Sequence, residues 1–292
     1  IMGLAYTLKK RGYETAFFHG GKNGTMNFDS YTYSAGFDKY FGLNEYTSLE
    51  DYDGNWGIQD EPYLQYFAQK LNTFKEPFLT SLFTLSSHHP YNIPEEYKKT
   101  LPSGVLEIQQ TIAYTDVSLR KFFKAIEQEA WFNNTLFVIT ADHTSQGVTA
   151  VGRNNLGQYS IPIAFYSPSD SSLTKRDINL PAQQTDIYPS IVHYLGIQDT
   201  LLCFGSSFFD ETKRRFAINF NYGQKIQILD SAFFLQIQED QPLALYRYRT
   251  DSLLKNNLID KEDSRELFTF YKAFMQQYNN RMIENKLVVE ME

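Results

Sequence analysis

The chain has 292 residues, of which 42% are hydrophobic and 16% aromatic, enough for one large α/β domain with or without a small appended one. Its formal net charge of −7, without any basic run, disfavours a phosphate-backbone partner, so we expect that it binds no nucleic acid. The single cysteine, Cys203, excludes an internal disulfide and a cysteine-rich metal site, and the sequence shows neither a signal peptide nor an apolar run long enough to span a bilayer.

Strands and helices alternate over roughly the first 200 residues. The spacing of apolar residues predicts helices over residues 3–11, 61–74, 105–128 and 185–195. Strands are predicted over residues 14–18, where the run stops at His19-Gly20-Gly21, and over the runs 77–85, 135–140 and 161–166. Residues 22–60 are rich in Gly, Asn, Asp and Tyr and lack periodicity, so we predict long loops there. The alternation predicts an α/β fold with a mostly parallel sheet and helices on both faces.

The pattern changes after this region, because strands then follow one another directly. Short strands are predicted over residues 216–220, 225–229, 233–237 and 243–248, separated by turn residues such as Asn221-Tyr222-Gly223. A long helix is predicted over residues 262–285. We therefore predict an α/β domain over residues 1–205 and a small antiparallel sheet with a terminal helix over residues 206–292.

The strand predicted over residues 135–140 runs directly into Ala141-Asp142-His143. In open α/β sheets, ligands bind beyond the carboxyl ends of the strands. An Asp-His pair at such a place can offer a carboxylate oxygen and an imidazole nitrogen to one divalent ion. Taken alone, the pair is also explained by an aspartate that caps a following helix beside a surface histidine.

Four of the five histidines of the chain follow three predicted strands: His19, His88, His89 and His143. If these strands are parallel, their carboxyl ends open onto one edge of one sheet, which favours a common site. Neighbouring side chains of an extended segment point to opposite sides, so only one of His88 and His89 can face that site. The fifth histidine, His193, lies within a helical pattern and is interpreted as structural.

Several motifs together resemble the lipoteichoic acid synthase branch of the sulfatase and alkaline phosphatase superfamily. They occur in the family's order over about the first 200 residues: Gly12 to Gly21, Gly36-Phe37-Asp38, Trp56-Gly57-Ile58-Gln59-Asp60, Thr84 to Pro90, Tyr114-Thr115-Asp116, Ala141-Asp142-His143-Thr144 and Thr185 to Pro189. The resemblance implies an alkaline-phosphatase/sulfatase-like fold. It also implies a metal-dependent phosphotransferase, or a hydrolase of sulfuric or phosphoric esters, with phosphoglycerol transferases among the relatives.

The resemblance also assigns roles to individual residues. Asp142 and His143 match the family's late ligands of one divalent ion, with manganese as the first choice and magnesium, zinc or calcium as alternatives. His88 matches a histidine that contacts the substrate phosphate and serves as acid or base. His19 matches a histidine of the headgroup pocket. Asn27, which has no match in the family pattern, is a further prediction for substrate binding.

The chain departs from the family pattern in two places. The phosphoglycerol transferases follow the His-Gly motif with a Trp and an Arg that grip the substrate, whereas this chain has Thr25-Met26-Asn27-Phe28. The absence of the arginine, a natural phosphate clamp, argues against phosphoglycerol itself as the substrate. The family's metal-binding Glu and nucleophilic Thr match a segment upstream of Ile1, and the chain lacks the Cys/Ser-x-Pro-x-Arg signature of formylglycine sulfatases.

The chain also opens on a helical pattern that has no N-cap residue before it. We therefore expect a carboxy-terminal part of a longer protein, inactive alone and prone to self-association through an exposed sheet edge.

Two hypotheses about function follow from these residues. The first is the extracytoplasmic part of a protein that a segment upstream of this chain anchors in the cell membrane, acting on a polar lipid headgroup or on another phosphate or sulfate ester. The alternative is a catalytically inactive ectodomain of the same fold that acts in binding or regulation. The two hypotheses differ in whether the upstream segment carries a nucleophilic Thr or Ser and a metal-binding Glu.

Overall fold

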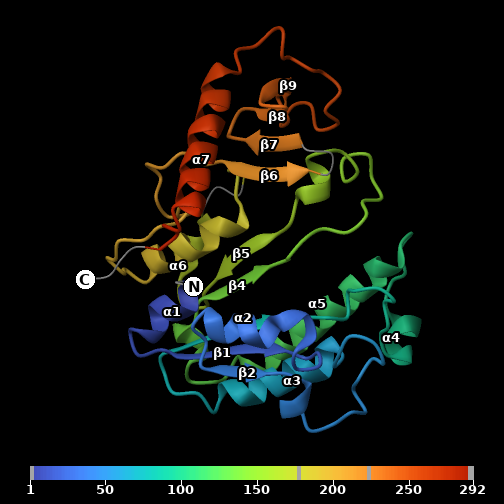
Figure 1. The fold of residues 1–292 in the computed structure, drawn as a ribbon. Helices are drawn as coiled ribbons and strands as arrows, with labels where there is room; N and C mark the ends of the chain where they lie inside the picture. Colours follow the sequence, from blue (N-terminus) through green and yellow to red (C-terminus); the bar gives the residue numbers. More distant parts are fainter. Residues whose placement is uncertain (1–2, 176–178, 222–224, 289–292) are drawn as a thin grey trace. The chain divides into compact units, whose positions relative to one another are not determined.

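The computed structural model describes residues 3–175, 179–221 and 225–288. They form two compact units, which are described one at a time (Figure 1). The first unit comprises Ile1–Leu136 and Ser167–Ser169, and the second comprises Phe137–Tyr166 and Asp170–Glu292. The division predicted near residue 205 is a different partition of the chain and stays a prediction. None of the helices in the described ranges is long and apolar enough to cross a membrane.

A three-stranded parallel sheet forms the centre of the first unit. Strand β1 (Glu14–His19) pairs with β2 (Lys39–Phe41) on one side and with β3 (Phe78–Phe83) on the other. The helices of this unit are α1 (Leu4–Lys9), α2 (Phe28–Ser34), α3 (Asp60–Leu71), α4 (Glu95–Thr100) and α5 (Glu107–Ile126), with short 3₁₀ turns at Thr25–Asn27, Leu43–Glu45 and Phe132–Asn134. The parallel pairing of β1 with β3 confirms the prediction for these two strands.

Neighbouring residues of β1 bind helices to opposite faces of this sheet. Phe17 stacks on Phe28 of α2 at a centroid distance of 6.2 Å. Phe18 points the other way and meets Phe67 of α3 edge-on at 4.7 Å. Phe67 in turn stacks on Phe122 of α5, and Figure 1 shows α2 and α3 on opposite sides of the sheet. The predicted layered arrangement of helices on both faces is thus confirmed in this unit.

The predicted loop over residues 22–60 is partly wrong, because it contains α2 and β2. Helix α2 has the sequence Phe-Asp-Ser-Tyr-Thr-Tyr-Ser, which is poor in strong helix formers and too short to show a clear period. It forms because Phe28 packs on Phe17, so tertiary contacts outweigh its weak intrinsic preference. Strand β2 has only three residues, but Tyr40 at its centre is buried against β1.

In the second unit, β4 (Phe137–Thr140) and β5 (Ile163–Tyr166) pair antiparallel in a two-stranded sheet. Both strands were predicted correctly as strands, but their assignment to the parallel sheet was wrong. A parallel neighbour requires a crossover that returns the chain to the start of the sheet, usually through a helix. The connection from residue 141 to residue 162 contains only the 3₁₀ turn Gly157–Tyr159, and it reverses the chain instead.

The rest of the second unit contains the predicted antiparallel meander. Strands β6 (Ala217–Asn221), β7 (Lys225–Leu229), β8 (Phe234–Gln238) and β9 (Gln241–Tyr246) form a sheet in that order. Helix α6 (Ile187–Tyr194) precedes this sheet and α7 (Arg265–Ile283) follows it, with 3₁₀ turns at Ser171–Lys175 and Gln184–Asp186. Of the predicted turn Asn221-Tyr222-Gly223, the last two residues lie outside the described ranges. The antiparallel sheet and the terminal helix are confirmed.

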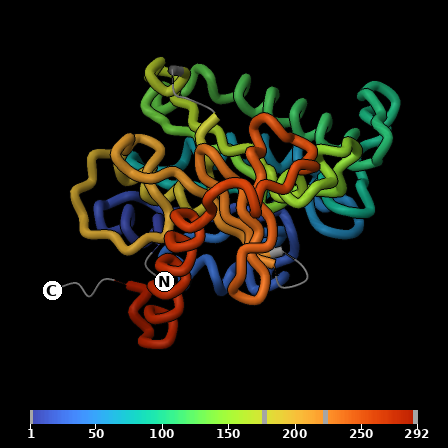
Figure 2. Tube along the Cα trace, turned by 90° about the horizontal axis from the view of Figure 1, so that it is seen from above, coloured from blue at the N-terminus to red at the C-terminus, as the bar shows by residue number. Residues whose placement is uncertain are grey.

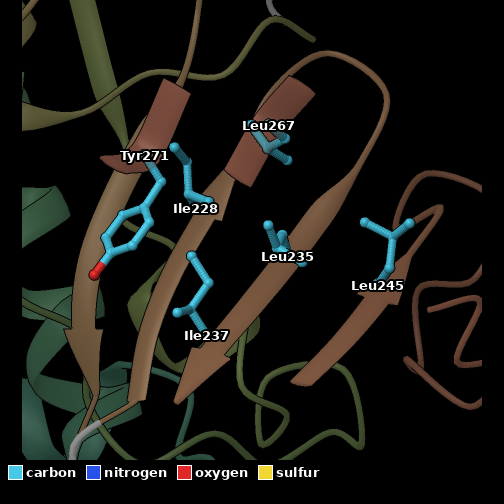
Figure 3. Close-up of a cluster of buried hydrophobic side chains, with 6 residues drawn as sticks. All are labelled: Ile228, Leu235, Ile237, Leu245, Leu267 and Tyr271. Carbon is cyan, nitrogen blue, oxygen red and sulfur yellow. The ribbon is translucent and has the colours of Figure 1, made fainter. Parts of the chain in front are cut away.

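One face of this four-stranded sheet packs against α7, which runs alongside it in Figures 1 and 2. The buried cluster, drawn in Figure 3, comprises Ile228, Leu235, Ile237 and Leu245 from the strands with Leu267 and Tyr271 from α7. Leu235 and Ile237 alternate with other residues along β8 and therefore point to the same face of the sheet. The close packing of their aliphatic and aromatic side chains forms the core of this part of the chain.

A buried ion pair also stabilises the second unit. The Arg215 guanidinium lies 3.1 Å from the Asp186 carboxylate, and their side chains are 10% and 2% exposed. Asp186 also accepts hydrogen bonds from the backbone N–H groups of Gln183 and Ser206. Arg215 donates further to the carbonyl oxygens of Pro181, Ser206 and Ser207. Every charged group of the pair is therefore hydrogen-bonded, which a buried pair requires.

Candidate functional site

His19 is the last residue of β1 and lies among aromatic side chains. Its imidazole stacks on the ring of Phe28 at a centroid distance of 4.4 Å, and its Nδ1 is 3.0 Å from the hydroxyl of Tyr40. Only 2% of its surface is exposed, and this burial lowers the pKa of His19 from 6.5 to about 4, because an imidazolium would lose its hydration. His19 is thus neutral near pH 7 and carries no positive charge for an anionic substrate.

The loops that follow β1 and β3 meet at Gly57. This residue forms an isolated antiparallel bridge with Gly21. A Cβ atom on Gly57 would lie 2.5 Å from the carbonyl oxygen of Gly20 and 2.6 Å from Cδ1 of Leu85, so only glycine fits between the two loops. The segment 52–58 therefore links the strand end that carries His19 to the strand end that precedes His88.

His88 lies in a turn shortly after β3, with its side chain exposed. Its backbone N–H donates to the carbonyl of Leu85 at 3.2 Å, and its Nδ1 is 2.9 Å from the carbonyl oxygen of His89. A carbonyl can only accept, so Nδ1 must carry the proton and donate. The neutral ring therefore keeps its lone pair on Nε2, where it can accept a proton from a reacting group or a hydrogen bond.

Trp56 packs on the ring of His88 at a centroid distance of 4.1 Å, and its indole N–H donates to the carbonyl of His89 at 2.6 Å. One carboxylate oxygen of Asp53 accepts the backbone N–H groups of Asn55, Trp56 and Gly57 at 2.7, 2.8 and 3.1 Å. These three hydrogen bonds fix the backbone of Trp56. The indole is therefore held in place and restricts where the imidazole of His88 can lie.

The structure distinguishes His88 from His89. The ring of His89 is also exposed, but it packs edge-on against Tyr91 at 5.7 Å and not against Trp56. The two adjacent rings therefore have different neighbours, as expected for successive side chains. That His88 and not His89 contacts a substrate stays a prediction.

The segment that was aligned with the family's Trp and Arg lies beside His19. Phe28 occupies the face of the His19 ring, whereas Met26 and Asn27 are exposed and adopt left-handed backbone conformations with φ of 50° and 59°. No basic side chain of this segment is available to bind a phosphate, because its four residues are Thr, Met, Asn and Phe. Asn27 presents a polar amide at the surface, and its role in substrate binding stays a prediction.

Asp142 and His143 follow β4 in the second unit. Oδ2 of Asp142 and Nε2 of His143 are 3.5 Å apart, and the two side chains are 53% and 75% exposed. Nδ1 of His143 is 2.7 Å from the carbonyl oxygen of Thr144 and must donate to it, so the lone pair of the neutral ring is on Nε2. Gln184 donates to the carbonyls of Ala141 and Asp142 at 2.8 and 3.0 Å and supports this corner.

The donor chemistry of this pair fits a divalent ion, but it supplies only two ligands. A carboxylate oxygen and an Nε2 lone pair that lie 3.5 Å apart can both reach one ion, and the hydrogen bond at Nδ1 holds the imidazole in the required tautomer. Structural and catalytic metal sites normally have three or four protein ligands. The described ranges contain no group of three or more His, Cys, Asp or Glu residues that could hold a metal.

The predicted site residues fall into two groups. His19, Asn27 and His88 belong to the first unit, whereas Asp142 and His143 belong to the second. The convergence of the two groups on one site stays a prediction. The sequence interpretation missed Trp56 and Asp60 as contributors, although both are in a motif that was noted, because nothing in the local pattern shows their contacts with the segment around His88.

Comparison with known proteins gives a consistent family and fold. The sulfatase family model matches residues 1–197. Lipoteichoic acid synthase 1 of Bacillus subtilis (strain 168) is 26% identical over 221 residues, which cover 70% of this chain and 34% of that protein. The chain spans about a third of the length of the curated relatives it matches.

Two solved structures are similar over nearly the whole chain. A protein in the alkaline phosphatase superfamily from Vibrio parahaemolyticus has a TM-score of 0.82 at 22% identity, covering 99% of this chain and 71% of that chain. The lipoteichoic acid synthase LtaP from Listeria monocytogenes has a TM-score of 0.78 at 19% identity, covering 100% and 74%. The predicted alkaline-phosphatase/sulfatase-like fold is therefore confirmed.

Proposed function

The chain belongs to the sulfatase family, and on that premise we propose that the whole protein is a metal-dependent enzyme that transfers or hydrolyses a phosphoric or sulfuric ester. The observation that carries this proposal is the state of His88. Its Nδ1–H is bound to the carbonyl of His89, its side chain is exposed, and its Nε2 has no hydrogen bond within the described ranges; the residue follows the carboxyl end of a parallel strand. Ligands of open α/β sheets bind at this edge.

We assign His88 the role of acid, base and phosphate contact. In the neutral ring Nε2 can accept a proton from an attacking alcohol or water, and in the protonated ring it can donate one to a leaving oxygen. Trp56 lies 4.1 Å from the ring and Nδ1 is bound to the backbone, so the imidazole is oriented before a substrate arrives. His19, neutral and buried, can offer only hydrogen bonds and ring contacts.

We propose that Asp142 and His143 hold one divalent ion together with ligands from outside this chain, with manganese first and magnesium, zinc or calcium as alternatives. When bound, the ion would polarise an ester oxygen and favour ionisation of the nucleophile. Within the chain, the Nδ1–H of His143 is bound to the carbonyl of Thr144, which keeps Nε2 available as a ligand.

The substrate proposed is a polar lipid headgroup ester, and the site would lie outside the cytoplasm, on a protein anchored in the cell membrane by a segment upstream of this chain. The names of the relatives, which are lipoteichoic acid synthases, support this class of substrate. The residues Thr25 to Phe28 argue against phosphoglycerol, because they include no cationic side chain.

We propose that the chain alone is inactive, because it contains two metal ligands and no residue that matches the family's nucleophile. The test compares the 292-residue chain with the whole protein, each assayed with manganese against a generic phosphodiester and a sulfate ester. We expect that only the whole protein turns over an ester, and that this turnover is lost when the metal is chelated. A His88→Gln substitution in the whole protein should lower kcat by about 10²–10⁴-fold.

Comparable turnover by the short chain would overturn the assignment of an outside nucleophile, and Thr25 and Thr144 would then be the first candidates. A whole protein that turns over neither ester, while it still binds manganese, would favour the non-catalytic alternative. In that case the fold would serve in binding or regulation.

A further inference from the structure

Asp60 is a buried carboxylate whose hydrogen bonds all go to other segments of the chain. It begins α3, yet only 2% of its surface is exposed. Its Oδ1 accepts the backbone N–H groups of Leu85 and Ser86 at 2.8 and 3.0 Å, and its Oδ2 accepts the hydroxyl of Thr115 on α5 at 2.7 Å. A buried charge is tolerated only when its oxygens are hydrogen-bonded in this way.

The carboxylate of Asp60 does not serve its own helix. An aspartate at a helix start usually accepts an N–H of the first turn, but α3 has no side-chain cap. Both backbone donors to Asp60 come instead from the segment that leaves β3. The function of this carboxylate is therefore to hold that segment.

Further hydrogen bonds lock the same segment. The hydroxyl of Ser86 accepts the backbone N–H of Asp60 at 3.0 Å, and the hydroxyl of Ser87 is 3.2 Å from the hydroxyl of Thr115. The turn then closes with the N–H of His88 on the carbonyl of Leu85 at 3.2 Å. Each residue from 85 to 87 is thus fixed, and the exposed His88 ring is the first side chain beyond this anchor.

We propose that Asp60 is a positioning residue for His88, holding the turn 85–88 so that the imidazole stays against Trp56. This inference rests on the proposed role of His88 for its chemical consequence, although the positioning itself can be measured without turnover. Asp60 touches neither the His88 ring nor Trp56 in any described contact, so its effect must pass through the backbone of Leu85 and Ser86.

The geometric test uses Trp56 as a reporter. In a Trp131→Phe background Trp56 is the only indole of the chain, because the sequence has two tryptophans. A protonated imidazole in contact with an indole quenches its fluorescence, so a fall in the Trp56 emission on acidification reports the contact with His88. His88→Gln should abolish this fall, and His89→Gln should retain it.

Asp60→Ala should lose most of the fall in Trp56 emission, because the N–H groups of Leu85 and Ser86 lose their acceptor and the turn shifts. Asp60→Asn should retain it, since the amide oxygen can take both N–H groups and the Thr115 hydroxyl can accept from the amide nitrogen. Thr115→Val, which removes the bonds to Oδ2 and to the Ser87 hydroxyl but leaves both backbone N–H groups their acceptor, should cause a smaller loss than Asp60→Ala. If Asp60→Ala does not fold, the other two variants still test the proposal, because Thr115→Val should reduce the fall and Asp60→Asn should retain it.

The matched control is Ser118→Ala. Ser118 is also fully buried on α5 and donates to the carbonyl of Tyr114 at 2.7 Å, but it makes no described contact with the turn 85–88. Its substitution should leave the fall unchanged. A folded Asp60→Ala protein that keeps the full fall would overturn the proposal, as would a Ser118→Ala protein that loses it equally.

The chemical test is a double-mutant cycle in the whole protein. Asp60→Ala should lower kcat, and in a His88→Gln background it should lower kcat no further, because its effect passes through His88. Equal and additive losses in both backgrounds would show a general structural role and overturn the proposal. If the whole protein turns over no ester, the proposed function fails, while the fluorescence of Trp56 still decides whether Asp60 positions the ring.

Discussion

Acidification should destabilise the first unit through His19. The pKa of His19 is about 4 in the folded chain and 6.5 when the group is free of the fold. Below pH 6.5 the unfolded state therefore binds a proton that the folded state excludes, so stability is complete above this pH and falls as the pH drops toward 4. Between pH 7.5 and pH 5 the two pKa values give a loss of about 2 kcal/mol.

The matched variant for this expectation is His19→Gln, which keeps a polar group beside Tyr40 but cannot titrate. The substitution lowers the free energy of unfolding relative to the natural chain, and this difference should be about 2 kcal/mol smaller at pH 5 than at pH 7.5. The reason is that only the natural chain loses the contribution of His19 on acidification. All other titrating groups are common to both proteins and largely cancel in the difference.

Denaturant unfolding followed by tryptophan fluorescence is a suitable assay. Trp56 and Trp131 both lie in the first unit, so the emission reports the unfolding of the unit that contains His19. Free energies at the two pH values follow from linear extrapolation. A cost of the substitution that is the same at both pH values would refute the argument, and it would mean that the His19 ring reaches water and charges readily in the folded state.

Three other substitutions test separate features. Arg215→Ala should destabilise the second unit by about 3–5 kcal/mol, because it leaves a buried carboxylate without its partner; hydrogen exchange of β6 to β9 should detect this. Gly57→Ala should cost about 1–3 kcal/mol, since its Cβ would lie 2.5 Å from a carbonyl oxygen, and the thermal midpoint of the first unit should fall. Phe28→Ala should uncover His19 and raise its pKa toward 6.5, which proton NMR of the imidazole can follow. These expectations would be contradicted by an unchanged exchange rate in Arg215→Ala, an unchanged thermal midpoint in Gly57→Ala or an unchanged imidazole titration in Phe28→Ala.

Local patterns were sufficient to predict the long helices and every strand except β2, which was interpreted as loop. The strands predicted over residues 14–18 and 77–85 have clear ends and correspond to β1 and β3. Helix α2 could not be predicted in the same way, because its seven residues are held by Phe28 on Phe17 and not by their own helix preference. The antiparallel direction of β5 was missed because the strand pattern alone does not give the direction in which the chain returns.

The contacts that hold the candidate site were harder to predict for a different reason. Asp60 binds Leu85, 25 residues along the chain, and Thr115, 55 residues along the chain, and no periodic pattern connects such positions. The histidines were found because strand ends are visible in the sequence and histidines are few. The environment of His19 depends on Phe28 and Tyr40, which come from a segment that was interpreted as loop.

His88 and His143 share one feature, since in each the Nδ1–H is bound to the main-chain carbonyl of the next residue. Many histidines are oriented instead by a neighbouring carboxylate or another side chain. A side-chain partner can be lost in a single substitution, whereas a main-chain carbonyl is present whatever residue stands at position 89 or 144. The tautomers of both rings are therefore robust to mutation, and a designer who wishes to invert them must rebuild the backbone turn and not exchange one residue.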